Sequence, residues 1–395
     1  ATGTVTIAGT SGLRPSGLLT ETRGSGAGGD VRLQAASLNL TDGATISSST
    51  LGSGTAGSVN VLASGTVTIA GGSSLRPSGL LTETQGSGAG GDLTLQAAAL
   101  QLLGGATISS STRGGGAAGD VNVSTSGAVT VSGHGDLGSS GLFAETRGAG
   151  DGGDVRLQAH VLTLADGGTI SSSSLGSGLA GNIDIRLGDS LEIWGGAIST
   201  RALTSDGGNI SIMAPRLIRL VNGQVTTSVE NGLGGGGNIF IDPEFVLLQD
   251  SQVIANAFGG PGGNIRIVAG QLIADPATTI SASSALGIDG AVNIDAPDTD
   301  VSAGLAVLPA AYLDASSLLR AGCSAARAGL SSLVEVGRGG LPPDPGGYLP
   351  SMDLGGLARG TRVADGTSRP SAAQQQAVRG AYTHLVALSI KGCGP

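Results

Sequence analysis

The stretch Gly262-Gly263-Asn264-Ile265-Arg266-Ile267 decides the fold, because a phrase of this form recurs ten times along the chain. Each copy has a glycine followed, two and four residues later, by aliphatic residues. The copies are Gly29–Leu33, Gly57–Val61, Gly91–Leu95, Gly119–Val123, Gly153–Leu157, Gly181–Ile185, Gly208–Ile212, Gly237–Ile241, Gly263–Ile267 and Gly290–Ile294. Successive glycine positions differ by 26 to 34 residues. A near-constant period of this size is typical of a solenoid.

Each period contains three short segments in which apolar and polar residues alternate, separated by Gly, Asp or Ser. In one period these segments are Val155–Leu157, Val161–Leu164 and Thr169–Ser171. Alternation of this kind predicts strands with one buried face, and residues 1–300 contain no sustained helical spacing. We therefore predict an all-β fold, a right-handed parallel β-helix of about ten coils with three strands per coil, over residues 1–300.

The predicted core consists of ladders of like residues stacked at the spacing of neighbouring strands, about 4.8 Å. β-branched residues suit such positions because they lose few rotamers there. The ladders are Val155, Ile183, Ile210, Ile239, Ile265 and Val292; Leu157, Ile185, Ile212, Ile241, Ile267 and Ile294; and Ile46, Ile108, Ile170, Ile198 and Ile280. The only tryptophan, Trp194, follows the inward-facing Leu191 and Ile193, so it should face outward or cover a corner.

The composition excludes several classes of protein. Glycine makes up 73 of 395 residues and aromatic residues only 2%, which argues against a conventional globular core. The net charge is −9 and Lys391 is the only lysine, so we expect no nucleic-acid partner and no anionic membrane partner. No apolar run reaches the ~18 residues of a membrane span. The chain lacks an initiator methionine and residue 1 falls inside a repeat, so we expect a C-terminal fragment of a longer protein.

The residue after the repeat glycine forms a further ladder of polar side chains. In the second half it is asparagine, at Asn182, Asn209, Asn238 and Asn264. We interpret these residues as a structural ladder of amide hydrogen bonds; a ligand site is the alternative. In the first half the position is often aspartate, at Asp30, Asp92, Asp120 and Asp154. This resembles calcium-binding nonapeptide repeats, but the phrase occurs once per coil rather than in tandem, and we predict no metal and no cofactor.

The first half also has a 62-residue superperiod, in which every second coil carries about six extra residues. The extra segments are Leu13–Leu19, Leu75–Leu81 and Leu137–Phe143. Insertions in a solenoid usually form loops on one face, often the binding face. We therefore predict a ridge and a candidate ligand site comprising Arg14, Glu21, Arg76, Glu83 and Glu145. Recent duplication without a selected function is the alternative.

After residue 300 the repeat stops. An open solenoid end exposes unpaired backbone groups, so we predict a capping segment over residues 301–351. Residues 352–395 should form a linker and a short C-terminal helix, Ser368–Lys391. Cys323 and Cys393, the only two cysteines, are candidates for a disulfide; two free thiols are the alternative.

The repeats and the segment after them resemble filamentous-haemagglutinin-type exoproteins, the secreted partners of bacterial two-partner secretion systems. The resemblance rests on the repeated Gly-Gly-Asn-Ile-x-Ile phrase, the pattern Leu-x-Leu…Asp-Gly-x-x-Ile-Ser between its copies, Leu313–Cys323 and Gly337–Pro345. It covers about residues 1–350, whereas residues 352–395 match no pattern of the family. It implies a right-handed β-helix, export through an outer-membrane transporter, and display at the Gram-negative cell surface.

Our functional expectation is a secreted, non-catalytic stalk or adhesin whose surface ligand (on a host cell, a bacterium or a carbohydrate) stays open. The first alternative is a β-helical polysaccharide-active enzyme, although the sequence has no catalytic constellation: His134, His160 and His384 are scattered. The second is the stalk of a contact-dependent effector, although the C-terminus is short. An autotransporter would require many further amphipathic strands after residue 300.

Overall fold

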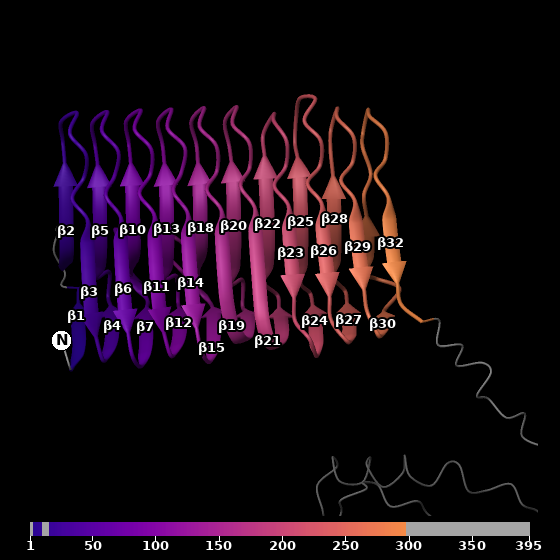
Figure 1. Cartoon of the computed structure of the whole chain (residues 1–395), viewed down its shortest axis with the longest axis horizontal. Coiled ribbons are helices and arrows are strands. Elements are labelled where there is room, and N and C mark those ends of the chain that lie inside the picture. The colour runs from indigo at the N-terminus through magenta and orange to yellow at the C-terminus, as the bar shows by residue number, and fades with distance from the viewer. Residues whose placement is uncertain (1–2, 10–15, 298–395) are drawn as a thin grey trace, which may run out of the picture. The chain divides into compact units, whose positions relative to one another are not determined.

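The computed structural model describes residues 3–9 and 16–297. These residues form a parallel β-helix of about ten turns, as the repeat predicts (Figure 1). The predicted cap (301–351), the linker and helix (352–395), Cys323, Cys393 and Arg14 lie outside the described residues. Within the described part, no helix is long and apolar enough to cross a membrane.

Each coil contributes strands at three positions, and each strand pairs in parallel with its equivalent in the next coil. The first-position strands are β3 (Val31–Ala35), β6 (Val59–Ala63), β11 (Leu93–Ala97), β14 (Val121–Thr125), β19 (Val155–Ala165), β21 (Ile183–Trp194), β23 (Ile210–Met213), β26 (Ile239–Asp242), β29 (Ile265–Val268) and β32 (Val292–Asp295). The second-position strands are β1 (Thr4–Ala8), β4 (Ser37–Thr41), β7 (Thr66–Ala70), β12 (Ala99–Leu103), β15 (Ala128–Ser132), β24 (Leu217–Val221), β27 (Phe245–Gln249) and β30 (Gln271–Ala274). Together these two positions form one sheet of 18 strands.

The third-position strands form a separate sheet of ten strands. They are β2 (Gly17–Thr22), β5 (Thr45–Thr50), β10 (Gly79–Thr84), β13 (Thr107–Thr112), β18 (Gly141–Thr146), β20 (Thr169–Ser174), β22 (Ala197–Ala202), β25 (Gln224–Val229), β28 (Gln252–Asn256) and β31 (Thr279–Ser281). The core lies between the two sheets.

In two coils the first two predicted strands merge into one. β19 and β21 each run through both positions, with a bulge between Ala159 and Val161 where their register shifts. Other coils bend at Ala36, Ser64-Gly65, Ala98 or Ser126-Gly127, whereas β19 passes this corner at His160 and β21 at Gly188-Asp189. The two continuous strands are neighbours and pair with each other on both sides of the bulge.

The apolar ladders fill the interior in register. Val155 pairs with Ile183, which pairs with Ile210, and all three are at most 1% exposed. The third ladder contains two residues that the sequence analysis assigned to a loop: Leu80 lies between Ile46 and Ile108, and Leu142 follows in the same row. Both leucines are 0% exposed.

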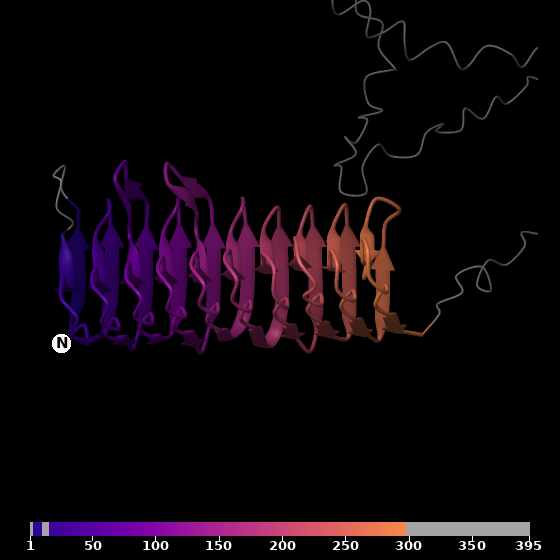
Figure 2. The ribbon, with the colours of Figure 1, turned by 90° about the horizontal axis from the view of Figure 1, so that it is seen from above.

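The segments Leu75–Leu81 and Leu137–Phe143 were interpreted as loops. This interpretation is wrong for the second half of each segment. Gly79–Leu81 and Gly141–Phe143 begin β10 and β18, because a coil without this leucine would leave a gap in the core ladder. The inserted residues form short antiparallel hairpins that protrude from the coils (Figure 2). The hairpin strands are β8 (Gly72–Ser73) with β9 (Arg76–Pro77), and β16 (His134–Gly135) with β17 (Gly138–Ser139).

The glycines of the repeated phrase allow close contact between the coils. A Cβ on Gly263 would overlap the carbonyl of Gly237 in the previous coil. Buried hydroxyls brace the same turns: Ser48 Oγ donates to the carbonyl of Gly29 (2.9 Å) and accepts from the amide of Gly57 (3.0 Å). The phrase is thus required for stacking, which is why it recurs in every coil.

Candidate functional site

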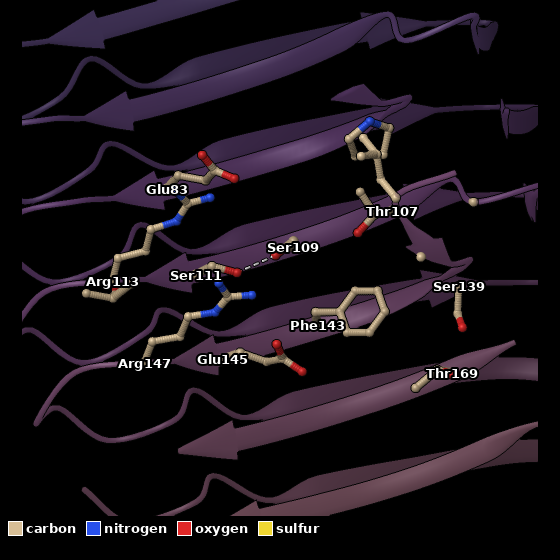
Figure 3. A pocket seen from close by; sticks show the side chains of 15 residues that line it. Glu83, Thr107, Ser109, Ser111, Arg113, Ser139, Phe143, Glu145, Arg147 and Thr169 are labelled. Carbon is tan, nitrogen blue, oxygen red and sulfur yellow. Dashed lines mark hydrogen bonds between the residues drawn. The ribbon is translucent and has the colours of Figure 1, made fainter. Parts of the chain in front are cut away.

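A groove of about 430 Å³ lies on the outer face of the ten-stranded sheet. Its floor is formed by β10, β13 and β18, and its walls differ in origin. One wall is the hairpin β16–β17, with Leu137 and Ser139, and the other carries Arg113 and Arg147 (Figure 3). We call it the Glu–Arg groove, after Glu83, Glu145 and these two arginines.

The carboxylates of the groove lie in one row of the sheet. Glu83 pairs with Ser111, and Ser111 pairs with Glu145 on the other side. The row extends backward through Ser49 to Glu21. Acid and serine therefore alternate, and the acids recur on every second strand, roughly 9.6 Å apart at the normal strand spacing.

Paired hydroxyl groups line the floor of the groove and continue along the sheet beyond it. The Oγ atoms of Ser109 and Ser111 lie 2.6 Å apart, and those of Ser171 and Ser173 lie 2.9 Å apart in the coil two strands further on. The hydroxyl of Ser171 also donates to Oε1 of Glu145 at 2.8 Å. This hydrogen bond fixes the carboxylate of Glu145 at the sheet surface, leaving its second oxygen for other partners.

An aromatic ring covers one end of the floor. Phe143 is half-buried, and its side chain faces the groove together with Thr169 and Ser139 (Figure 3). The ring lies against Gly141: a Cβ at that position would approach Phe143 Cζ and the carbonyl oxygen of Thr169 to 2.5 Å each. Glycine at the start of β18 is therefore what allows the ring to lie on the sheet.

The carboxylates and guanidinium groups of the Glu–Arg groove form no ion pairs within the described residues. Among the described residues, no carboxylate lies within ion-pair distance of Arg113 or Arg147, and none of the described cations pairs with Glu83. The first superperiod differs, because Arg23 contacts Glu21 at 2.6 Å. Two exposed guanidinium groups and two half-buried carboxylates thus remain for hydrogen bonds to a ligand.

The structure brings together only part of the predicted ridge. Glu83 and Glu145 line the Glu–Arg groove and Glu21 continues their row, but all three lie on sheet strands rather than on a protruding loop. Arg76 is exposed on the hairpin strand β9, where Ser73 Oγ accepts from its backbone amide, and it does not line the groove.

Sequence reasoning missed Arg113, Arg147 and Phe143. The two arginines follow the third-position strand in the sequences Ser111-Thr112-Arg113 and Glu145-Thr146-Arg147. Two residues along a strand share a face, so the alternation could have placed each arginine beside the acid–serine row. The position of Phe143 in the groove could not be predicted in this way, because the segment Leu137–Phe143 was interpreted as a loop.

The asparagine ladder lies at a different corner, at the start of the first-position strands. The amide oxygen of Asn182 accepts from both the backbone and the side-chain nitrogen of Asn209, each at 3.0 Å. The same double contact links Asn209 to Asn238 and Asn238 to Asn264. Each of these amide oxygens therefore accepts hydrogen bonds from the next coil. This is what the structural interpretation of the ladder expects, rather than the ligand site.

The aspartates continue the ladder toward the N-terminus. Oδ1 of Asp120 accepts from the amide of Asp154 at 2.9 Å, and Oδ1 of Asp154 accepts from that of Asn182 at 2.8 Å. Repulsion between these acids is offset by Arg156, which contacts Asp120 at 2.7 Å and Asp154 at 2.5 Å. The hydrogen bond to Asp120, followed by the nearby carboxylates, raises the pKa of Arg156.

The structure also brings a serine and a histidine together on the second hairpin. Ser139 Oγ lies 3.0 Å from His134 Nδ1. A catalytic pair would require a carboxylate to orient the ring, yet among the described residues no carboxylate is hydrogen-bonded to His134, and Asp166 accepts from Ser132 at 3.1 Å. The ring packs over Gly167, where a Cβ would overlap it, so this contact anchors the hairpin to the next coil.

No three residues among His, Cys, Asp and Glu gather as a metal-binding group in residues 3–9 and 16–297. Trp194 is 37% exposed and faces outward, one of the two positions predicted for it. Compared with known proteins, the chain matches no family model, no curated protein and no solved structure.

Proposed function

We propose that this chain is the stalk of a secreted, non-catalytic surface adhesin of the filamentous-haemagglutinin type, and that the Glu–Arg groove is its recognition surface. The observation that carries the proposal is the unpaired charge of Glu83, Arg113 and Arg147 on a rigid sheet beside Phe143. A groove with donors, acceptors and one aromatic face can bind a polar ligand without any reaction.

The β-helix supports a role in display. Its strands pair from coil to coil, so the groove sits on a continuous sheet and not on a loop that must order upon binding (Figure 1). A pre-formed surface loses little conformational entropy when a ligand binds. Export through an outer-membrane transporter and exposure at the bacterial surface rest on the resemblance of the repeats.

Adhesion of beads coated with the chain to host cells and to bacteria tests the proposal. We expect the double variant Glu83→Gln/Arg113→Gln to reduce adhesion, because it removes both charges of one subsite. The matched control is Glu244→Gln/Arg266→Gln, which makes the same charge changes at exposed positions, one just before β27 and one on β29 of the other sheet. Equal adhesion of both variants and the unaltered chain would refute the recognition role of the groove.

Localisation is tested separately. Antibodies raised against the coils should label intact cells of the source bacterium or detect the protein in its culture medium. Labelling only after the cells are broken would contradict secretion and would leave the groove experiment valid.

A polysaccharide-cleaving enzyme is the second candidate, and one observation favours it. Glu83 and Glu145 face the same groove roughly 9.6 Å apart by strand spacing, near the upper end of the carboxylate separation of inverting glycosidases. Release of reducing ends from polysaccharides that disappears in Glu83→Gln and Glu145→Gln would establish this activity. No release with either the unaltered chain or the variants would favour the stalk.

A further inference from the structure

A second groove runs along the opposite sheet and differs chemically from the Glu–Arg groove. Three hollows of about 420, 480 and 280 Å³ lie on the outer face of the first-position strands, and Gln96 lines all three. They extend over β3, β6, β11, β14, β19 and β21, which follow one another along the rod (Figure 1). We refer to these three adjoining hollows together as the amide groove.

The middle of the amide groove is polar but uncharged. Its outward side chains are amides, hydroxyls and one exposed leucine: Asn60, Leu62, Thr94, Gln96, Asn122, Ser124 and Gln158. These groups both donate and accept hydrogen bonds, and Leu62, 46% exposed, adds an apolar platform. A ligand that matches them carries many hydroxyl groups and some apolar ring surface.

Of the three arginines that line this groove, Arg156 and Arg186 are already neutralised, whereas Arg32 on β3 has no ion pair among the described residues. Arg156 contacts Asp120 and Asp154, and Arg186 contacts Asp184 at 2.6 Å. An anionic ligand would have to compete with these carboxylates. Outside the hollow that contains Arg32 the charges are thus balanced, which favours a neutral ligand.

The amides repeat with the superperiod. Gln96 pairs with Leu62 on one side and with Ser124 on the other, and Ser124 pairs with Gln158. Gln96 and Gln158 are thus two strands apart, roughly 9.6 Å, and Gln34 occupies the equivalent position one superperiod earlier. In an extended β-1,4-linked glycan every second sugar faces the same way, so a chain lying along the rod would present the same hydroxyls to successive glutamines.

We propose that the amide groove binds an extended, neutral, linear polysaccharide aligned with the rod axis. Six strands span about 24 Å along the axis, enough for several sugar units. A peptide fits less well, because it would pair with a free strand edge, whereas β6, β11 and β14 are paired on both sides. The proposal concerns a different face from the Glu–Arg groove and does not depend on adhesion.

Isothermal titration calorimetry with cellohexaose, mannohexaose and xylohexaose, together with the corresponding disaccharides, tests this site on the full chain. We expect at least one hexasaccharide to bind and its disaccharide to bind much more weakly, because only the longer chain reaches successive glutamines. Gln96→Ala should weaken binding about tenfold, the loss of roughly one hydrogen bond. Circular dichroism confirms that each variant retains the fold.

Gln101→Ala is the matched control: Gln101 is exposed in the same coil, on β12, and lines none of the hollows. An equal loss of binding in this control would overturn the assignment, as would the absence of binding by all three hexasaccharides. Binding of heparin alone, abolished by salt, or of an unrelated extended peptide alone, would also refute a neutral-glycan site.

Discussion

The guanidinium of Arg219 lies over the indole of Trp194, with Arg219 Cζ 4.3 Å from the ring centroid. Trp194 ends β21 and Arg219 lies on β24, so the contact joins two successive coils at the outer surface. The indole nitrogen donates to Glu192 Oε2 at 3.4 Å, so a carboxylate lies at the edge of the same ring.

Removal of this guanidinium should be visible in fluorescence, because Trp194 is the only tryptophan. In Arg219→Ala we expect a red-shifted emission and stronger acrylamide quenching, since water replaces the cation over the ring. Arg201→Ala, which breaks the exposed pair with Glu230, should leave the spectrum unchanged. An identical spectrum in Arg219→Ala would mean that the contact is not populated in solution.

The asparagine ladder should stabilise the middle of the rod. Asn238→Ala removes an acceptor of two hydrogen bonds from Asn264 and one donor to Asn209, so we expect a local loss of about 1–2 kcal/mol. Hydrogen exchange of the Asn264 backbone amide measures this effect directly. Asn39→Ala, on β4 and outside the ladder, is the control; equal protection of Asn264 in both variants would contradict the structural role.

The pair Asp189–Arg216 should titrate at low pH. Two contacts of 2.6 Å join the carboxylate to the guanidinium, and this hydrogen bonding, aided by Ser190, lowers the pKa of Asp189 to about 2. Because the folded pKa is below the ordinary value of about 3.9, the contribution to stability is fully present above pH 4 and is lost as the pH falls toward 2. Carboxyl NMR titration checks the value, and Arg216→Gln should raise it toward the ordinary one.

Gly141→Ala should disturb the Glu–Arg groove from below. The new methyl group meets both the Phe143 ring and the carbonyl of Thr169, so we expect a displaced ring and a loss of about 1–3 kcal/mol. Thermal unfolding and the NMR shifts of Phe143 report the two effects. Gly115→Ala, at a glycine with open space around it, is the control. Unchanged Phe143 shifts in Gly141→Ala would contradict the packing described above.

Leu142 and Leu137 distinguish core from hairpin tip within one inserted segment. Leu142→Ala opens a cavity beside the core ladder and should cost about 2–5 kcal/mol. Leu137 is 52% exposed at the tip, and Leu137→Ala should change stability by less than about 0.5 kcal/mol. Chemical denaturation of the two variants decides the matter; similar losses would place both leucines in the same environment.

The repeated glycine and the alternation around it were sufficient to predict the β-helix, because each copy must satisfy the same stacking geometry. They did not predict where the inserted segments return to the sheet. Leu80 and Leu142 look like part of a loop in a single coil, and only the neighbouring Ile46 and Ile108 show that the row would otherwise be empty.

The candidate site could be predicted only in part, for a related reason. Glu83 and Glu145 were recognised from their 62-residue spacing, but Arg113 belongs to the short coil between them and has no equivalent exactly one superperiod away. A surface built from successive coils combines residues that differ in period. The turn before the third-position strand was easier to predict from the sequence. Its backbone is left-handed at Asp42, Asp166, Asn222 and Asp250, and aspartate and asparagine tolerate this conformation.

The long and short coils make the rod divisible in units of two. Thr66–Gly127 repeats Thr4–Gly65, and β15 continues the row formed by β4, β7 and β12. Excision of residues 66–127 would therefore join Gly65 to Ala128 with every ladder still matched, whereas loss of only the short coil between the hairpins β8–β9 and β16–β17 would place one hairpin beside the other. Unequal recombination between the two copies would lengthen or shorten the protein in increments of roughly 9.6 Å while keeping the strand rows in register. The number of copies of this duplicated pair of coils therefore determines the length of the β-helix.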